Sequence, residues 1–156
     1  MKQKALLLLR VSLGLLLVIW GADKLLNVDH GMKVSEHFYG NLVSAPSMMT
    51  AFGVIEIILG LAIVAGLGRR YTYPAMLLVT GVTLIAVWKS IIDPLGKMFE
   101  GGQLLFYPSI IIFAGALVLW AFRDEDDLSL DQRGRAGMLR EVRAENDRMV
   151  QRDPGV

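Results

Sequence analysis

Three charged residues lie in or at the edge of the first long apolar stretch of the sequence: Arg10, Asp23 and Lys24. A charge at the bilayer centre costs about 2.5 to 3.5 kcal/mol on insertion scales, so such residues face protein partners or water. At helical spacing, Arg10 and Lys24 share one face with Gly14 and Gly21. We therefore expect this face to point into protein.

A carboxylate that could pair with these cations lies well inside a second apolar stretch. Glu56 shares a helical stripe with Gly53 and Gly60. Small residues let helices approach closely in lipid, where helix association depends on packing contacts. We therefore expect these glycines to face the glycines of the first helix, which brings Glu56 opposite the first charged stripe.

Two interpretations of these charges stay open. In the first, Glu56 accepts or relays a proton in a polar cavity, and Lys24, Lys89 or Arg10 holds an anionic or carbonyl-bearing ligand, such as a quinone head group or an oxyanion. In the second, the charges form a salt-bridge network that only fixes helix pairing. Lys89 can also extend to the membrane interface without a partner.

The composition indicates what positions these side chains. The 156 residues are 54% hydrophobic, and the apolar residues gather in long runs. A helix needs about 20 mostly apolar residues to cross a membrane. We predict an all-α membrane four-helix bundle over residues 1–122, with an outer interfacial loop and a charged tail at 123–156. The four predicted spans cover about 5–26, 49–67, 73–92 and 104–122.

The distribution of cations predicts the orientation of the bundle. Lys2 and Lys4 precede the first predicted span, Arg69 and Arg70 separate the second from the third, and Arg123 follows the fourth. Cytoplasmic loops carry an excess of such residues. We therefore expect a multi-pass protein of a bacterial-type inner membrane, with both termini in the cytoplasm.

The loop after the first predicted span contains both histidines of the chain, His30 and His37. Val34, Phe38 and Leu42 recur there at helical spacing, which predicts a short interfacial helix. The two histidines could bind a metal only with a third ligand, so a solvated or capping role competes with that interpretation. We predict no metal site.

The composition also excludes several classes of function. The chain has no cysteine, which removes disulfides, thiolate metal sites and a dithiol relay. No ligand set for haem or an iron–sulfur cluster is visible. The net charge of +1 is spread over loops and tail, so we expect no nucleic-acid partner.

The charged tail contains a candidate helix. Ser129 and Gln132 have the spacing of a capping box, and Leu139, Val142 and Met149 are apolar positions in the sequence that follows. This helix could fold against a membrane or cytoplasmic protein subunit, or it could be a solvated tail. A homo-oligomer is a further candidate assembly.

The charged and glycine-rich segments resemble DoxX-like membrane proteins. The resemblance rests on RVSLG at 10–14, WGADKL at 20–25, IEIILG at 55–60 and GLGRR at 66–70. It extends from about Arg10 to Trp120 and leaves the tail outside.

The resemblance implies a four-helix bundle with a loose link to redox metabolism, since relatives are associated with thiosulfate:quinone oxidation. It also implies that Arg10, Lys24 and Glu56 form the polar core. We therefore expect an accessory or quinone-contacting subunit of a membrane redox complex. The alternative is a noncatalytic structural or assembly subunit that binds a protein through its tail.

Overall fold

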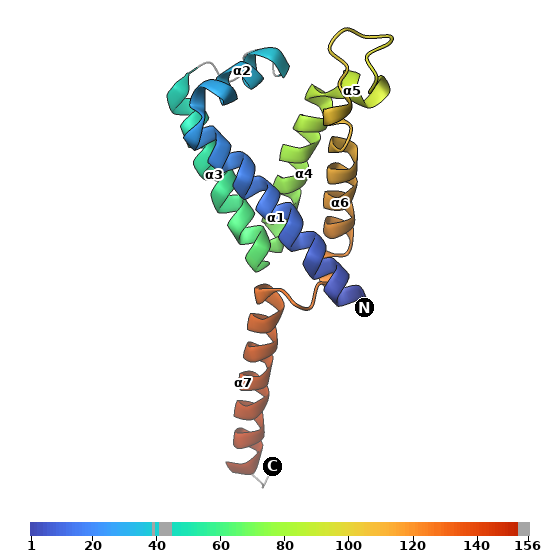
Figure 1. Ribbon diagram of the computed structural model, residues 1–156. Coiled ribbons are helices and arrows are strands. Elements are labelled where there is room, and N and C mark those ends of the chain that lie inside the picture. The colour runs from blue at the N-terminus through green and yellow to red at the C-terminus, as the bar shows by residue number, and fades with distance from the viewer. Residues whose placement is uncertain (39, 41–44, 153–156) are drawn as a thin grey trace.

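The computed structural model describes residues 1–38, 40 and 45–152 of the chain. These residues form seven α-helices and two short 3-10 helices and no strand, so the all-α prediction is confirmed (Figure 1). The elements are α1 (Lys2–Leu26), α2 (Val28–Phe38), α3 (Pro46–Ala65), α4 (Arg69–Ala86), α5 (Trp88–Ile92), η1 (Leu104–Phe106), α6 (Ser109–Ala121), η2 (Arg123–Glu125) and α7 (Leu130–Arg152).

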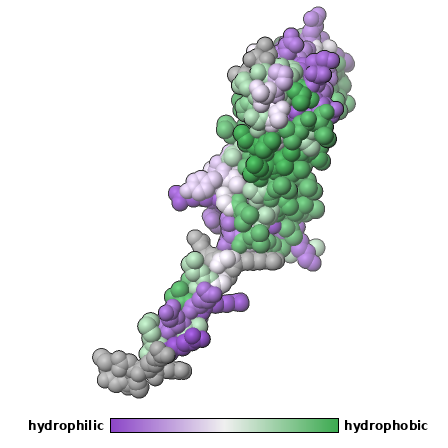
Figure 2. All heavy atoms as spheres, turned by 90° about the vertical axis from the view of Figure 1, so that its left-hand side faces the viewer, coloured by the Kyte–Doolittle hydropathy of each residue, from purple (hydrophilic) through white to green (hydrophobic). Residues whose placement is uncertain are grey.

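Three helical segments of the described chain are long and apolar enough to cross a membrane. They are α1, α3 and the stretch Leu104–Ala121, which combines η1 with α6. Figure 2 shows a broad apolar face in the middle of the molecule, between hydrophilic ends. Large exposed side chains on α1 and α3 include Leu8, Ile19, Ile55, Ile58 and Leu61. Such a surface suits lipid and identifies a multi-pass membrane protein.

The region expected to form the third span, 73–92, is divided between two helices. α4 begins earlier, at Arg69, and ends at Ala86, and α5 begins after Val87. Arg69 and Arg70 lower the mean hydropathy of α4, which is not among the three membrane-length apolar segments. The Ser90 hydroxyl of α5 accepts the Gln103 amide at 3.1 Å, which ties α5 to the chain before η1.

α1 and α3 pack antiparallel through two glycine pairs. A Cβ on Gly14 would lie 2.7 Å from the Gly60 carbonyl oxygen, and one on Gly21 would lie 2.6 Å from that of Gly53. The backbones therefore touch where the sequence predicted contact. The two glycine pairs define one register between α1 and α3. In this register Arg10 lies level with the C-terminal end of α3, two helical turns beyond Glu56.

The helices pair as α1 with α3 and α4 with α6. The two pairs lie closest near the N-terminal end of α1 and diverge toward α2 and α5 (Figure 1). The buried core lies where they meet and consists of Leu13, Leu17, Ile63, Tyr73, Met76, Ala116 and Leu119. This arrangement leaves α7 outside the bundle, projecting away from it.

The predicted interfacial helix corresponds to α2, which ends at Phe38. Leu42, which the periodicity included, lies outside the described residues. Phe38 contacts Phe106 of η1 edge to face, with ring centroids 5.0 Å apart. This contact bridges the two helix pairs at the end of the bundle opposite α7.

Candidate functional site

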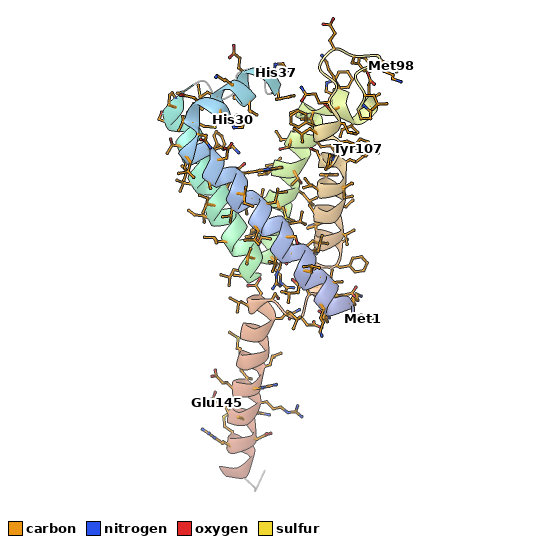
Figure 3. All side chains as sticks on the ribbon, in the orientation of Figure 1. Met1, His30, His37, Met98, Tyr107 and Glu145 are labelled. Atoms are coloured by element: carbon orange, nitrogen blue, oxygen red, sulfur yellow. The ribbon has the colours of Figure 1, made fainter. Side chains whose placement is uncertain are left out.

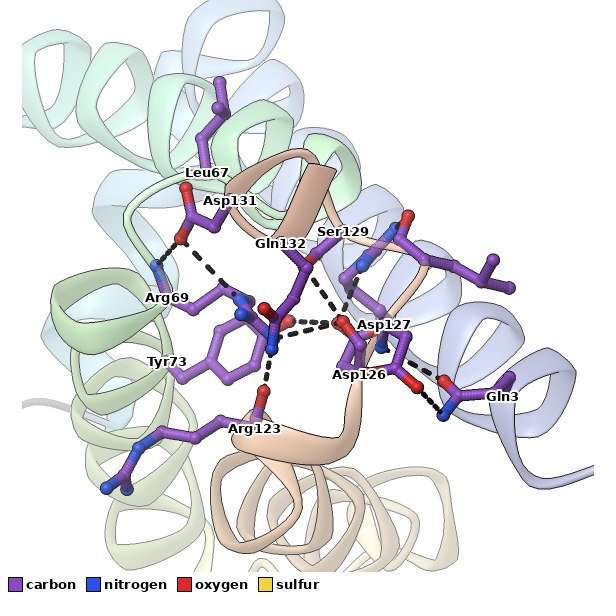
Figure 4. A network of polar contacts seen from close by, with 12 residues as sticks. Gln3, Leu67, Arg69, Tyr73, Arg123, Asp126, Asp127, Ser129, Asp131 and Gln132 are labelled. Carbon is purple, nitrogen blue, oxygen red and sulfur yellow. Dashed lines mark hydrogen bonds and ion pairs between the residues drawn. The ribbon is translucent and has the colours of Figure 1, made fainter. Parts of the chain in front are cut away.

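A buried ion pair joins the first helix to the segment between α6 and α7. Arg10 Nη1 donates to Asp126 Oδ2 at 2.6 Å, and the two side chains are 3% and 0% exposed. The Tyr73 hydroxyl donates to the same carboxylate oxygen at 2.9 Å. Because α1 and α4 both reach Asp126, one carboxylate connects three distant parts of the chain (Figure 4).

The segment around Asp126 is held by further hydrogen bonds, and we call Arg123–Asp131 the basal segment. Arg69 Nη1 donates to the carbonyl oxygens of Arg123 and Asp126, the latter at 3.1 Å. Arg10 Nη2 donates to the Leu128 carbonyl oxygen at 3.3 Å. The basal segment is therefore bound to both arginines through its backbone, and to Arg10 also through the side chain of Asp126.

Asp131 fastens the far end of the basal segment. Its two carboxylate oxygens accept the backbone amides of Gly68 at 3.1 Å and Arg69 at 3.0 Å, at the start of α4. The first amides of a helix have no partner within the helix, and a carboxylate there also interacts favourably with the helix dipole. Asp131 thus caps α4 from a position more than 60 residues later.

The two arginines and Asp126 are not fully satisfied. Arg10 Nε, Arg69 Nε and Asp126 Oδ1 are buried and have no hydrogen-bond partner among the described residues. Arg69 Nε lies 3.6 Å from Asp131 Oδ2, an ion pair without a hydrogen bond. Buried polar atoms are nearly always hydrogen-bonded, so three such atoms among Arg10, Arg69 and Asp126 are unusual.

Asp126 was not among the residues expected in the site, although its partner Arg10 was. Asp126 lies in an acidic run with Asp124 and Asp127, both of which are exposed. Charge density alone therefore indicated a solvated segment. One usable signal was position: Asp126 follows closely after the end of α6, at the same end of the bundle as Arg10.

A second ion pair lies on the α1–α3 interface. Lys24 Nζ donates to Glu56 Oε2 at 2.7 Å, and the side chains are 27% and 12% exposed. The Trp20 carbonyl oxygen lies 3.5 Å from the same ammonium group. Glu56 therefore meets Lys24, while Arg10 lies 14 residues, or about 21 Å along α1, from Lys24. This partly open pair can exchange its internal bond for one to a carbonyl or an anion.

The remaining predicted site residues form no contact with the partners Asp126 and Glu56. Asp23 accepts Asn27 Nδ2 at 2.8 Å and lies 2.8 Å from His30 Nδ1, in an exposed cluster. Lys89 is exposed on α5. Figure 3 shows His30 and His37 at the α2 end, opposite Met1. Among the described residues, no group of three or more His, Asp and Glu could hold a metal.

Asp93 organises the loop after α5. Its carboxylate accepts the backbone amides of Met98 and Phe99, the latter at 2.9 Å. These hydrogen bonds, that of Met98 first, lower the pKa of Asp93 below its usual value because they stabilise the charged form. Asp93 therefore fixes the turn and is not a free acid.

Comparison with known proteins identifies the family. No curated protein and no solved structure matches the chain. The family model described as DoxX matches residues 5–90. This range includes Arg10, Lys24, Glu56 and Tyr73 and ends before Asp126. Because the match covers more than half of the sequence, the chain belongs to the DoxX family.

Proposed function

We propose that this DoxX protein is an accessory subunit of a membrane redox complex, and that it binds a partner protein through α7. In this proposal four segments span a bacterial-type inner membrane, with α4 and α5 together as the third span and both termini in the cytoplasm. The redox assignment depends on the associations of the family. The observation that carries the docking role is the exposure of α7 beside its firmly held base.

The surface of α7 supports a docking role. Met138, Leu139, Val142 and Met149 are each more than half exposed. Leu139, Val142 and Met149 recur at helical spacing on α7, and the charged residues Arg143 and Glu145 lie among them. Most of the stability of a helix in a protein comes from packing of its apolar face, so a partner that covers the apolar stripe would also stabilise α7.

The attachment of α7 to the bundle also supports a docking role. Asp131 in its first turn bonds to the start of α4, and Asp126 just before it bonds to Arg10. A helix that only solubilises the chain would need no such attachment. The attachment allows a force or displacement on α7 to reach α1 and α4.

The test removes the docking helix and keeps its base. Deletion of residues 133–156 leaves Asp126 and Asp131 in place, and native purification with mass spectrometry then compares the copurifying proteins. We expect the truncated protein to reach the membrane normally and to lose its partner. Retention of every partner found with the full chain would contradict the proposal. As a matched control, Lys89→Gln changes an exposed residue at the other end and should keep the partner.

A second candidate function is contact with a quinone head group at Lys24 and Glu56. The partial exposure of this pair supports it, because a closed pair could not reach a ligand. Glu56→Gln should then reduce quinone-dependent activity of the complex while the protein stays assembled. Glu100→Gln changes an exposed acid in a loop and provides the control. Equal rates for both variants would exclude quinone contact through Glu56.

A further inference from the structure

The site around Asp126 contains more hydrogen-bond donors than the carboxylate uses. Arg10 gives it one N–H group, and Tyr73 gives it one O–H group. The Nε groups of Arg10 and Arg69 are buried and have no hydrogen-bond partner among the described residues, and the same is true of Oδ1 of Asp126. Arg69 Nε has only an ion pair, with Asp131 Oδ2 at 3.6 Å. Arginine binds an oxyanion most strongly through two parallel N–H groups, a geometry that Asp126 does not use with Arg10.

The donors and the carboxylate come from different parts of the chain. Arg10, Arg69 and Tyr73 all lie within the region matched by the DoxX family model, and Asp126 lies beyond it. The donors therefore belong to the family's helical bundle, whereas the carboxylate is brought by the basal segment. Figure 4 shows the basal segment crossing the ends of these helices.

Gly66 has no side chain and so leaves space for Arg10 and Ser129. A Cβ at this position would lie 2.8 Å from Arg10 Nη1 and 2.6 Å from the Ser129 Cβ. Gly66 also has a φ of +70°, a conformation that glycine adopts readily. The end of α3 thus forms a recess that admits the guanidinium group of Arg10 and lets Ser129 pack over it, fully buried.

We propose that Arg10, Arg69 and Tyr73 form a binding site for a tetrahedral oxyanion, and that Asp126 occupies this site as a tethered competitor. A tetrahedral anion offers more acceptor oxygens than a carboxylate, so it can accept bonds from the Nε groups as well. Its binding displaces Asp126 and exposes Ser129. The oxyanion is either free in solution or the phosphate of a lipid headgroup. This proposal does not depend on the partner of α7.

A single cysteine can report the displacement. The chain contains no cysteine, so Ser129→Cys provides a unique thiol that is buried while the basal segment is docked. The labelling rate with a membrane-impermeant maleimide is measured on the full chain in detergent, in sodium sulfate or phosphate and in sodium chloride of equal ionic strength. Mass action predicts about a tenfold faster rate when the oxyanion is present at about ten times its Kd for the undocked state, as long as the docked state still predominates.

A lipid arm distinguishes the two sources of the oxyanion. The same variant is labelled in nanodiscs of phosphatidylcholine with and without phosphatidic acid. Acceleration by phosphatidic acid but not by sulfate or inorganic phosphate assigns the site to a lipid headgroup, and the reverse assigns it to a free anion. Asp127→Cys, at an exposed neighbouring position, should show no such acceleration and corrects for changes in thiol reactivity.

Variants of the site connect the effect to its residues. In the Ser129→Cys background, Asp126→Asn weakens the competitor and should lower the oxyanion concentration needed for half-maximal labelling about tenfold or more. Arg10→Lys keeps the charge but loses the planar donor pair, so it should raise that concentration. A merely structural ion pair would show no dependence on the kind of anion in either variant.

The unmodified chain provides a second measurement if Ser129→Cys does not fold. The Arg123 carbonyl is hydrogen-bonded to Arg69 when the basal segment is docked, so limited trypsin cleavage after Arg123 should accelerate with the oxyanion. The proposal is overturned if sulfate, phosphate and phosphatidic acid all leave the cleavage rate, or the labelling rate where that variant folds, at the chloride value.

Discussion

Two ion pairs of α1, Arg10 with Asp126 and Lys24 with Glu56, are chemically similar but differ in their surroundings. Arg10 and Asp126 are almost completely buried, are 116 residues apart and share their contacts with Tyr73 and Arg69. Lys24 and Glu56 join two neighbouring helices and are partly exposed. The first pair organises how the chain closes, and the second is open to exchange. Burial and connectivity, more than the identity of the charges, therefore separate the two roles.

The largest expected effect comes from breaking the buried pair. Arg10→Gln leaves Asp126 buried without its cation, which typically costs about 3 to 5 kcal/mol. The free energy of unfolding in detergent should fall by that amount relative to the unchanged chain. Lys4→Gln, at an exposed position of the same helix, is the control. A loss below about 1 kcal/mol would mean that the buried pair is no more important than the open one.

A second variant tests the packing that sets the positions of both pairs. Gly60→Ala would bring a Cβ within 2.6 Å of the Gly14 carbonyl oxygen, so the α1 and α3 backbones must separate. Overpacking of this kind costs about 1 to 3 kcal/mol, measured as unfolding free energy. Gly134→Ala, where a Cβ would meet nothing within 4 Å, should not destabilise the protein. Equal stabilities for both variants would refute the close glycine contact.

Of these two ion pairs, Lys24 with Glu56 should contribute less to stability. Lys24→Gln is expected to lower the unfolding free energy by about 1 kcal/mol or less, because water competes for both side chains. This variant should also leave the labelling of a thiol at position 129 unchanged, since Lys24 lies far along α1 from the basal segment. A loss as large as that of Arg10→Gln would remove the distinction between the two regions.

The smallest effect is a local dependence on pH outside both pairs. The folded pKa of Asp93 lies below the ordinary 3.8, so its stabilising contribution is complete above that value. It is lost as the pH falls through the lowered pKa, when the carboxylate becomes protonated. Hydrogen exchange at the amides of Met98 and Phe99 should then accelerate, beyond the intrinsic change of exchange with pH. In Asp93→Asn this additional pH dependence should be absent.

The local features that organise the helices could be predicted from the sequence. Apolar runs indicated α1, α3 and α6, and helical spacing indicated the glycine faces of α1 and α3. Side chains that pair across neighbouring helices, as Lys24 and Glu56 do, follow from the same periodicity. The break at Val87 could not be predicted, because the contact of Ser90 with Gln103 joins segments whose approach depends on the loop between them.

The partner of Arg10 could not be predicted for a different physical reason. Asp126 has the same local surroundings in sequence as its exposed neighbours Asp124 and Asp127. Asp126 is buried because the chain turns back after α6 and contacts α1 and α4. Sequence periodicity does not describe such a turn. The fixed register of α1 and α3 explains why Glu56 does not pair with Arg10, because the glycine contacts hold the two residues two helical turns apart.

The distance in sequence between Arg10 and Asp126 also has a consequence for biosynthesis. The N-terminal helix leaves the ribosome first, and the carboxylate that neutralises its arginine is made only after α6. During the intervening translation, Arg10 has no native counterion and must stay near water or lipid headgroups. Closure of the basal segment therefore comes after the synthesis of α1, α4 and α6. A chain that ends before residue 126 lacks the carboxylate that pairs with Arg10 in the folded protein.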